Sequence, residues 1–307
     1  MSTMGMNLKK RGVRYSPDRI IFYTLGYILL IFFAFACLIP FYLTIVNSFM
    51  DEGAILRDGY GFYPRVFSLN GYGMILKNPT NIIHSYGITA FVTVIGTFLS
   101  LFMITMTGYV LSRRDFHYRN PMSFFFYFTT LFNGGLVPYY LLCTKFLHFT
   151  NHVYALILPS MFSVFNMIIS KNFFRSIPFE IVESAKIDGA NDFTIYLKLM
   201  LPVCTPLLAT IGLFTALGYW NDWYNCMLFI NSRHQELYTL QYYLQNMINS
   251  AQAIQRVAEK SGMPFTTVPM ESMKMAMTVI ATGPMLLAYP FVQKYFVKGL
   301  TIGAVKG

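Results

Sequence analysis

Long apolar runs without a charged residue constrain the fold of this 307-residue chain most strongly. The first run, Ile20 to Met50, contains no Asp, Glu, Lys or Arg, and a membrane-spanning helix needs about 20 mainly apolar residues. A secretory signal peptide has a shorter apolar region and ends in a small-residue cleavage pattern, which this run lacks. The sequence therefore predicts that the run is a first spanning helix.

Five further uncharged runs follow, and the composition agrees with a protein that crosses the membrane several times. Hydrophobic residues make up 55% and charged residues 12% of the chain, with a mean hydropathy of +0.48, whereas a soluble domain is about one-quarter charged. We expect an all-α polytopic membrane protein, with a basic tail at residues 1–19 and a transmembrane domain at 20–307. Its six predicted spans are about 20–46, 86–112, 120–144, 150–170, 203–226 and 275–294.

Lysine and arginine are distributed unevenly between the predicted loops, and this bias sets the expected orientation. With the N-terminus in the cytoplasm, fifteen of the 23 Lys and Arg residues fall inside and eight fall outside. The net charge of +10 is therefore attributed to topology, so membrane lipid is an expected partner and nucleic acid is not. Both termini are expected in the cytoplasm, together with the loop 176–202.

The segment between the fourth and fifth predicted spans carries the signals of a helical hairpin. Pro178 suits a first helical turn, where its missing N–H costs nothing, with Ser176 or Ile177 at the cap. Glu180 and Glu183 then fall in the early turns, where the positive end of the helix dipole favours carboxylates. A short helix is expected from this point.

A glycine is expected to end that first helix. Gly189 suits a left-handed C-terminal stop, and Asn191 can cap a second helix that runs to Leu201. Pro202 and Pro206 mark its boundary with the next apolar run. The sequence thus predicts a helix–glycine turn–helix unit at the cytoplasmic surface of the membrane.

Three short stretches of this hairpin resemble the EAA loop of ABC importer permeases, the segment that docks onto the ATPase subunit. They are Glu183-Ser184-Ala185, Asp188-Gly189-Ala190, and Leu199 with Leu201-Pro202. Ser184 stands where the family usually has Ala, and Leu199 where Ile is common. The resemblance covers nearly the whole chain and points to the carbohydrate-uptake branch, similar to the second permease of maltose-type systems. The plain alternative is an ordinary amphipathic hairpin.

The resemblance implies a type I ABC importer permease fold in a bacterial plasma (inner) membrane, driven by other subunits. The implied partners are a second homologous permease, a dimer of ATP-binding cassette ATPases, an extracytoplasmic sugar-binding protein and an oligosaccharide substrate. ATP and Mg would bind to the ATPase, because this chain has no G-x-x-x-x-G-K-[ST] loop. We expect no catalytic residue, cofactor or metal on this chain. The implied coupling residues are Glu180, Glu183, Ser184, Ala185, Asp188, Gly189, Ala190 and Pro202.

The fifth predicted span ends in a mixture of aromatic and polar residues, Trp220-Asn221-Asp222-Trp223-Tyr224. Aromatic faces stack on sugar rings while Asn and Asp bind hydroxyls, so these residues are candidates for a substrate pathway. Trp and Tyr also anchor helices at membrane–water interfaces. The resemblance, in which a Trp-Asn pair recurs after the EAA segment, favours a pathway role for Trp220 and Asn221. Asp222, as an acid at the end of a span, is a further functional candidate.

A glycine pair interrupts the third predicted span, where Asn133-Gly134-Gly135 is followed by Pro138. Glycine and proline weaken helical hydrogen bonding, which lipid does not tolerate unless the backbone faces protein or water. The break is expected either to line the translocation pathway, with Asn133, or to be a helix end at the outer rim.

An ion-coupled secondary solute transporter is the alternative from another functional class. It would require ionisable residues at the middle of the membrane and internal repeats, and the sequence shows neither. The predicted function is therefore that of a permease subunit of an ATP-driven importer, which moves a carbohydrate, most consistently an oligosaccharide, into the cytoplasm.

Overall fold

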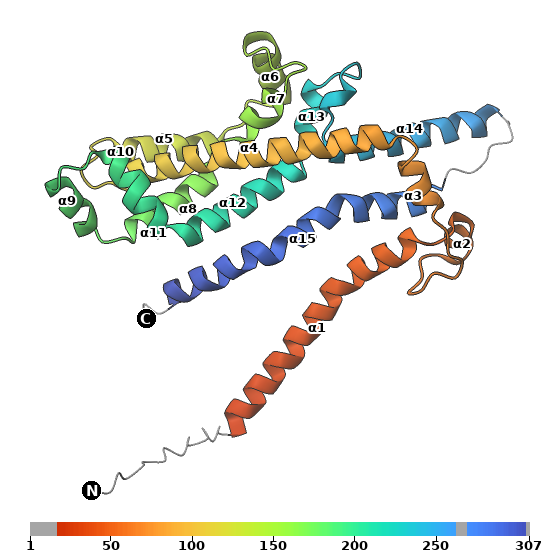
Figure 1. Cartoon of the computed structure of the whole chain (residues 1–307), viewed down its shortest axis with the longest axis horizontal. Coiled ribbons are helices and arrows are strands. Elements are labelled where there is room, and N and C mark those ends of the chain that lie inside the picture. The colour runs from red at the N-terminus through yellow and green to blue at the C-terminus, as the bar shows by residue number, and fades with distance from the viewer. Residues whose placement is uncertain (1–16, 262–268, 305–307) are drawn as a thin grey trace, which may run out of the picture.

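The computed structural model describes residues 17–261 and 269–304, and every regular element in these ranges is a helix (Figure 1). The one strand-like contact there is an isolated bridge between Met50 and Phe67. The predicted all-α class is confirmed. The longer helices are α1 (Pro17–Ser48), α4 (Pro79–Ser112), α5 (Arg119–Leu131), α8 (Val164–Arg175), α9 (Glu180–Ile187), α12 (Thr205–Trp220), α14 (Leu240–Ser261) and α15 (Met270–Ala304).

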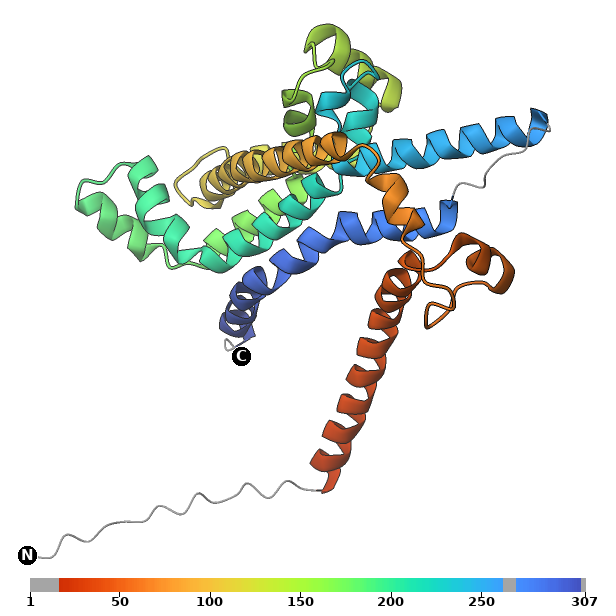
Figure 2. The same ribbon diagram turned by 45° about the vertical axis from the view of Figure 1, so that its right-hand side comes forward.

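Shorter elements connect these helices. In chain order they are α2 (Glu52–Asp58), α3 (Asn70–Ile75), α6 (Leu136–Leu141), the π-helix η1 (Leu142–Phe146), α7 (Tyr154–Ile157), the 3-10 helix η2 (Leu158–Ser160), α10 (Asp192–Thr194), the π-helix η3 (Ile195–Met200), α11 (Leu201–Val203), α13 (Tyr224–Phe229) and the 3-10 helix η4 (Gln235–Leu237). The α9–α11 hairpin lies at one end of the long axis, and α2, α3 and α14 lie at the other (Figures 1 and 2).

The first two predicted spans correspond to two continuous helices. Among the described residues, α1 and α4 are long and apolar enough to cross a membrane. At 1.5 Å per residue, the 32 residues of α1 are about 48 Å long, which exceeds a hydrocarbon core of about 30 Å. None of the most apolar part of α1 is buried within the chain, and the helix diverges from the other long helices (Figure 2). Its apolar side chains therefore face lipid or another subunit.

Other predicted spans are bent or broken. η2 and α8 meet at 54°, and the helical run Asp192–Val203 meets α12 at 85°. If each bent pair is one span, the described residues contain up to four spans. The predicted span 120–144 is divided between α5, α6 and η1, whereas 275–294 falls inside the single helix α15. A total of six spans therefore stays a prediction.

The segment 51–84, which the sequence predicts to be an outer loop, is folded against its own chain. Glu52 is buried, and its carboxylate accepts the backbone N–H groups of Glu271 and Ser272, both at 3.0 Å. A carboxylate at this position satisfies free donors at the start of α15 and complements the helix dipole. Gly71 lies so close that an added Cβ would meet the Ser272 backbone at 2.9 Å. The segment therefore fixes the N-terminal end of α15.

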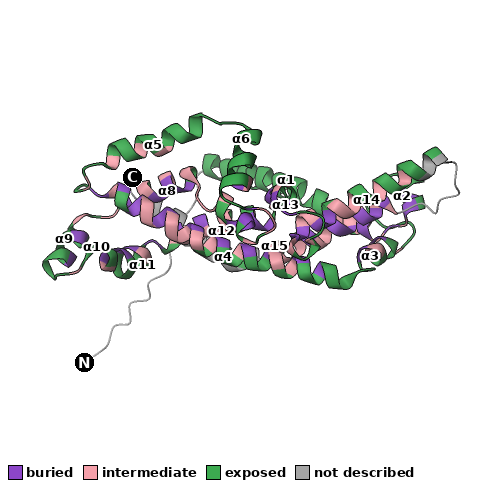
Figure 3. Cartoon of the chain, turned by 90° about the horizontal axis from the view of Figure 1, so that it is seen from above, coloured by how far each residue is buried: buried purple, intermediate pink, exposed green. Residues whose placement is uncertain are grey.

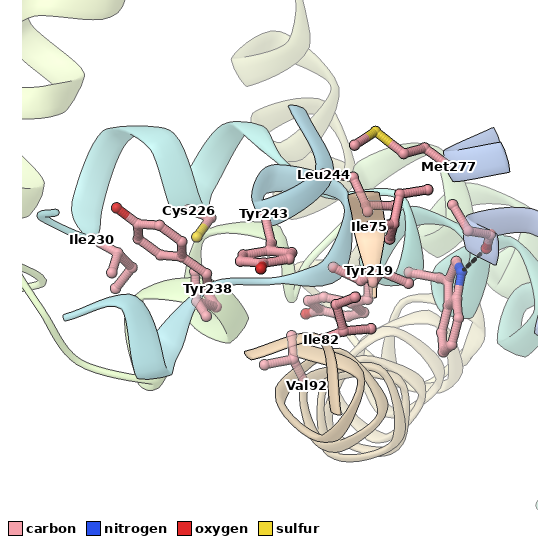
Figure 4. Packing of buried hydrophobic residues seen from close by; sticks show 14 of the residues in the cluster. Ile75, Ile82, Val92, Tyr219, Cys226, Ile230, Tyr238, Tyr243, Leu244 and Met277 are labelled. Atoms are coloured by element: carbon pink, nitrogen blue, oxygen red, sulfur yellow. Dashed lines mark hydrogen bonds between the residues drawn. The ribbon is translucent and has the colours of Figure 1, made fainter. Parts of the chain in front are cut away.

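The two largest apolar clusters among the described residues form most of the core, and α4 passes through both. One gathers α3, α4, α12, α14 and α15 around Tyr219 and Tyr243 (Figure 4), and the other lies beneath the hairpin. Small residues on α4 allow close packing: a Cβ on Gly96 would meet the Tyr219 ring at 2.6 Å, and a Cβ on Gly108 would meet Ser170. Figure 3 shows the resulting purple band of buried residues along α4 and α12.

Candidate functional site

The hairpin at residues 176–202 forms, but its first helix begins later than the sequence suggested. α9 starts at Glu180, and its cap residue is Phe179, which makes no side-chain cap hydrogen bond. The expected cap at Ser176 or Ile177 is therefore wrong. Phe179 and Ile177 instead pack against the core cluster beneath the hairpin, so apolar contact sets the start of the helix.

The turn between the two helices is the one predicted. Gly189 has a φ of +81°, in the left-handed region that glycine adopts without strain. The Ala190 N–H donates to the Ala185 carbonyl at 3.0 Å, the bond of a Schellman ending. The Asn191 Oδ1 accepts the Thr194 N–H at 2.8 Å, which confirms the predicted cap. The second helix continues through η3 and α11 to Val203, slightly past the predicted end, with Pro202 in its last turn.

The hairpin presents a polar surface outward and an apolar surface to the core. Val182 and Ala185 are buried against the cluster that includes Tyr109, Phe174 and Tyr196. Ala190 is half-buried, and Ile187 is 86% exposed. The remaining predicted coupling residues are all exposed: Glu180, Glu183, Ser184, Asp188 and Pro202. This chain therefore leaves free the acidic surface that a partner could bind.

A buried arginine, which the sequence did not identify, fixes the hairpin to the end of α4. The Arg113 side chain is 8% exposed. Its Nε donates to Asp115 at 2.7 Å, and its Nη1 donates to Asp192 at 2.9 Å and to the Tyr109 hydroxyl at 2.8 Å. Lys186 adds a second cation, 2.9 Å from Asp115 and 3.7 Å from Asp192. The four charged residues, here named the Arg113 network, join α4 to both helices of the hairpin.

In the sequence, Arg113 contributed only to the count of positive charges that sets the predicted topology. Its pairing with Asp115 could have been predicted, because the arginine ends an apolar run and the aspartate follows two residues later. The partners Lys186 and Asp192 come from more than 70 residues away in sequence, so only the folded chain shows them together.

Three members of the Arg113 network, Arg113, Asp115 and Lys186, stay charged over a wide pH range. Hydrogen bonding to Arg113 holds the pKa of Asp115 well below its usual range, whereas hydrogen bonding to Asp115 raises the pKa values of Arg113 and Lys186. The Asp115 carboxylate contributes its full stabilisation above the ordinary aspartate pKa of about 3.9. This stabilisation is lost only as the pH falls through the lower pKa that Asp115 has in the folded chain. The stabilisation from the lysine is complete below about pH 10.4 and is lost only above it.

We therefore expect the protection of α9 amides against hydrogen exchange, after correction for the intrinsic rate, to stay constant between about pH 5 and about pH 8. Exchange mass spectrometry of the full chain in detergent measures this directly. A titration of α9 protection inside that interval would show that another group controls the hairpin.

Most of the predicted pathway residues line a cavity of about 650 Å³ beside α12. Its walls include Asn221, Asp222, Trp223 and Tyr224, together with Tyr139 of α6, and no lysine or arginine is among the described lining residues. The two aromatic residues Trp223 and Tyr224 are exposed. The cavity therefore offers aromatic faces, amide and hydroxyl groups and one carboxylate, all of which can bind a sugar.

Asp222 holds the backbone at this cavity in place. Its Oδ1 accepts the N–H groups of Tyr224 and Asn225 at 3.0 and 3.1 Å, and its Oδ2 accepts the Asn225 side-chain amide at 2.6 Å. These bonds occupy both carboxylate oxygens at the start of α13. Asp222 therefore positions Trp223 and Tyr224.

Trp220 lies elsewhere. Its side chain is 8% exposed within the core cluster around Tyr219 and Tyr243, and its indole N–H donates to the Ala281 carbonyl of α15 at 2.9 Å. The structure thus places Trp220 between α12 and α15, where it joins two long helices, and not among the residues that line the 650 Å³ cavity.

The predicted break in the third span is present. α5 ends at Leu131, Gly135 has a φ of +88°, and the Asn133 Oδ1 accepts the Gly135 N–H at 2.8 Å. Asn133 lines a second cavity of about 720 Å³, which shares Tyr139 and Tyr224 with the first. The structure thus brings Asn133 next to the polar end of α12, more than 80 residues away in sequence.

Similarity to known proteins covers almost the whole chain, although no protein-family model matches it. The chain is 40% identical to the polygalacturonan/rhamnogalacturonan transport system permease protein YtcP of Bacillus subtilis, over 94% of this chain and 99% of that protein. It is 36% identical to Protein LplC of the same organism, over 88% of this chain and 90% of LplC. It is 27% identical to the arabinooligosaccharides transport system permease protein AraQ of Halalkalibacterium halodurans, over 90% of this chain and 94% of AraQ.

A solved structure has the same fold. A chain from the crystal structure of a bacterial ABC transporter involved in the import of the acidic polysaccharide alginate superposes with a TM-score of 0.76 and 30% sequence identity. The match covers 92% of this chain and 99% of that one.

Proposed function

This chain belongs to the permease subunits of carbohydrate ABC importers, and from that premise we propose that it provides part of an oligosaccharide pathway and receives its driving force through the hairpin 176–202. Such permease subunits are not enzymes, because a separate subunit hydrolyses ATP. This membership favours the importer over the ion-coupled secondary transporter.

The observation that carries the coupling proposal is the hairpin itself. Its buried surface is fixed to α4 by the Arg113 network, while Glu180, Glu183 and Asp188 are exposed, and the hairpin lies at one end of the molecule (Figure 1). A rigidly anchored acidic projection can bind a cationic or polar groove on an ATPase. Glu183 makes the principal contact with the ATPase, and Gly189 permits its close approach.

Ala185 has a different role from the one first expected. Its side chain is 7% exposed and faces the core of its own chain. Its small size allows α9 to approach the aromatic residues beneath it. The residue therefore supports the hairpin and leaves contact with the ATPase to the opposite surface.

Coupling follows from the anchored geometry. Closure of an ATPase pair upon ATP binding pushes the hairpin, and the Arg113 network transmits that displacement to α4. The long helices then rock between inward-open and outward-open states, a population shift driven by the ATPase's different affinities for its nucleotides. ATP and Mg bind to the ATPase in this scheme, and a second homologous permease completes the pathway.

The same arrangement sets the proposed topology in a bacterial plasma membrane. The hairpin end faces the cytoplasm and the α2–α3–α14 end faces outward, toward an extracytoplasmic substrate-binding protein. Both termini are proposed to lie in the cytoplasm; residues 1–16 and 305–307 are outside the described part of the chain.

The proposed substrate pathway runs through the two adjoining cavities. Asn133, Asn221, Trp223 and Tyr224 contact the sugar, and Asp222 holds the last two in position. YtcP is named for polygalacturonan and rhamnogalacturonan, and the structural relative imports alginate, an acidic polysaccharide. We therefore propose an oligosaccharide that contains uronic acid as the substrate.

The test is ATPase stimulation of the complete importer, reconstituted with its binding protein, across a panel of acidic and neutral oligosaccharides. We expect oligogalacturonides or related uronates to stimulate hydrolysis, and we expect Trp223→Ala to lower stimulated transport about fivefold, because it removes a stacking surface worth about 1 kcal/mol. Phe146→Ala is the matched control, since Phe146 is an exposed aromatic residue outside both cavities. Stimulation by no member of the panel would contradict the assigned function.

A further inference from the structure

A third cavity lies at the base of the hairpin, and Arg113 but not Asp115 is among its lining residues. It has a volume of about 220 Å³ and is lined by four arginines, Arg113, Arg114, Arg119 and Arg175. They come from the end of α4, the start of α5 and the end of α8. Three helix ends thus direct cationic side chains toward one space, here named the arginine pocket.

The positive charge of the arginine pocket is not balanced within the described part of the chain. No Asp or Glu is among its lining residues. Asp115 and Asp192 neutralise Arg113, but the side chains of Arg114 and Arg175 have no ion-pair or hydrogen-bond partner in residues 17–261 and 269–304. Arg119 makes a single long contact, from Nη1 to the Arg113 carbonyl at 3.5 Å. Three guanidinium groups therefore retain most of their donors.

We propose that the arginine pocket binds a phosphate group. Guanidinium groups donate two parallel hydrogen bonds to phosphate oxygens, which gives both strength and geometric fit. Tyr109 also lines the pocket, and its hydroxyl accepts from Arg113, which leaves its own hydrogen to donate. A volume of about 220 Å³ equals that of about seven water molecules, which suits one phosphate group.

Membrane topology alone does not explain this arrangement. The excess of Lys and Arg in cytoplasmic loops requires only that the charges lie near the membrane, and it does not require several of them to meet in one cavity. Holding unpaired cations together costs free energy through mutual repulsion. An anion that fills the cavity removes this cost, so the geometry favours a bound ligand.

The arginine pocket lies where a bound ligand would contact the hairpin. Pro178, Phe179 and Val182 of the hairpin form part of its wall. A bound phosphate group therefore joins the ends of α4, α5 and α8 at the point where the hairpin begins. Its source is either the headgroup of an anionic lipid of the inner leaflet or a free phosphate from the cytoplasm.

The experiment uses the full chain, purified in an uncharged detergent and stripped of lipid. Native mass spectrometry compares retention of dioleoylphosphatidylglycerol with that of dioleoylglycerol, which has the same acyl chains and no phosphate. Calorimetry with inorganic phosphate forms the second arm. We expect Arg114→Gln and Arg175→Gln each to weaken binding about fivefold, in line with about 1 kcal/mol for each cation near a phosphate.

Lys198→Gln is the matched control, because Lys198 is an exposed cation of the hairpin outside the pocket. The affinity of this variant for phosphatidylglycerol or phosphate should stay within about twofold of that of the unmodified chain. Retention of phosphatidylglycerol alone would assign the site to lipid, and phosphate binding that competes with the lipid would assign it to a free anion. Both results support the pocket. Binding of neither probe, or equal loss in Lys198→Gln, would overturn the proposal.

Discussion

Gly189→Asp is expected to leave the chain folded in the membrane but to abolish both recruitment of the ATPase and sugar uptake. Gly189 has a φ of +81°, and a Cβ there would meet no atom within 4 Å among the described residues beyond its chain neighbours. The substitution therefore creates no internal clash. It adds backbone strain of about 1–2 kcal/mol and a negative charge at the tip of the hairpin, where the ATPase is proposed to bind.

Gly59→Asp is a control that matches Gly189→Asp in two respects. Gly59 also has a positive φ, of +74°, and open space around it, but it lies after α2, at the opposite end of the molecule from the hairpin (Figure 1). Its ψ of −174° places it in a region that only glycine adopts readily, so Gly59→Asp should show at least as much strain, with normal ATPase recruitment. The measurement is co-purification of the ATPase with each variant, followed by uptake in cells. Normal co-purification with Gly189→Asp would remove the basis for the coupling role.

Gly189→Asn separates the two reasons for a glycine at this position. Asparagine tolerates the left-handed conformation better than other residues, so this variant keeps the turn but adds a side chain. If recruitment fails, the ATPase requires close approach. If recruitment survives while Gly189→Ala fails, the turn conformation is the essential property.

Local chemistry made part of this structure predictable. Gly189 and Asn191 act through bonds to residues only a few positions away, so their sequence signals were sufficient. The long uncharged runs likewise predicted α1 and α4, because a helix is the one regular element that satisfies its own backbone in lipid. The glycine pair near Asn133 predicted a break for the same reason.

Contacts between distant segments were not predictable. Trp220 has the composition of a pathway residue, yet a hydrogen bond to Ala281 places it in the core. Asp222 was misassigned for another reason: its oxygens bind the backbone and side chain of residues two and three positions further on, and this local role was not weighed in the prediction from sequence. The start of α9 was misplaced because packing of Phe179 outweighed a side-chain cap. In each case the partner, and not the residue type, decides the role.

Removal of both carboxylates from the Arg113 network is expected to destabilise the hairpin strongly, because the arginine is buried and its partners are exposed. Arg113 is 8% exposed, whereas Asp115 and Asp192 are 42% and 65% exposed. Removing the arginine leaves two carboxylates that water can solvate. Removing both carboxylates leaves a buried guanidinium without a counter-charge, which costs about 3–5 kcal/mol. The double variant Asp115→Asn/Asp192→Asn is therefore expected to release the hairpin from α4.

Release of the hairpin should uncouple ATP hydrolysis by the ATPase from sugar transport by the permease. We expect the double variant to lose protection of α9 amides against hydrogen exchange and to lose sugar-stimulated ATP hydrolysis, because displacement of the hairpin no longer reaches α4. Asp58→Asn serves as the control, since it removes a carboxylate from an exposed ion pair with Arg65 at 3.1 Å, and such pairs contribute about 0–1 kcal/mol.

A third substitution tests whether the buried charge is the cause. Adding Arg113→Met to the double variant replaces the unpaired guanidinium with an apolar side chain, a change that is often neutral or stabilising. Protection of α9 should recover in the triple variant, while stimulated hydrolysis should recover only in part, because no ion pair joins α4 to the hairpin. If Arg113→Met alone is more damaging than loss of both carboxylates, the asymmetry is absent, and α9 is held by the contacts of Val182 and Ala185.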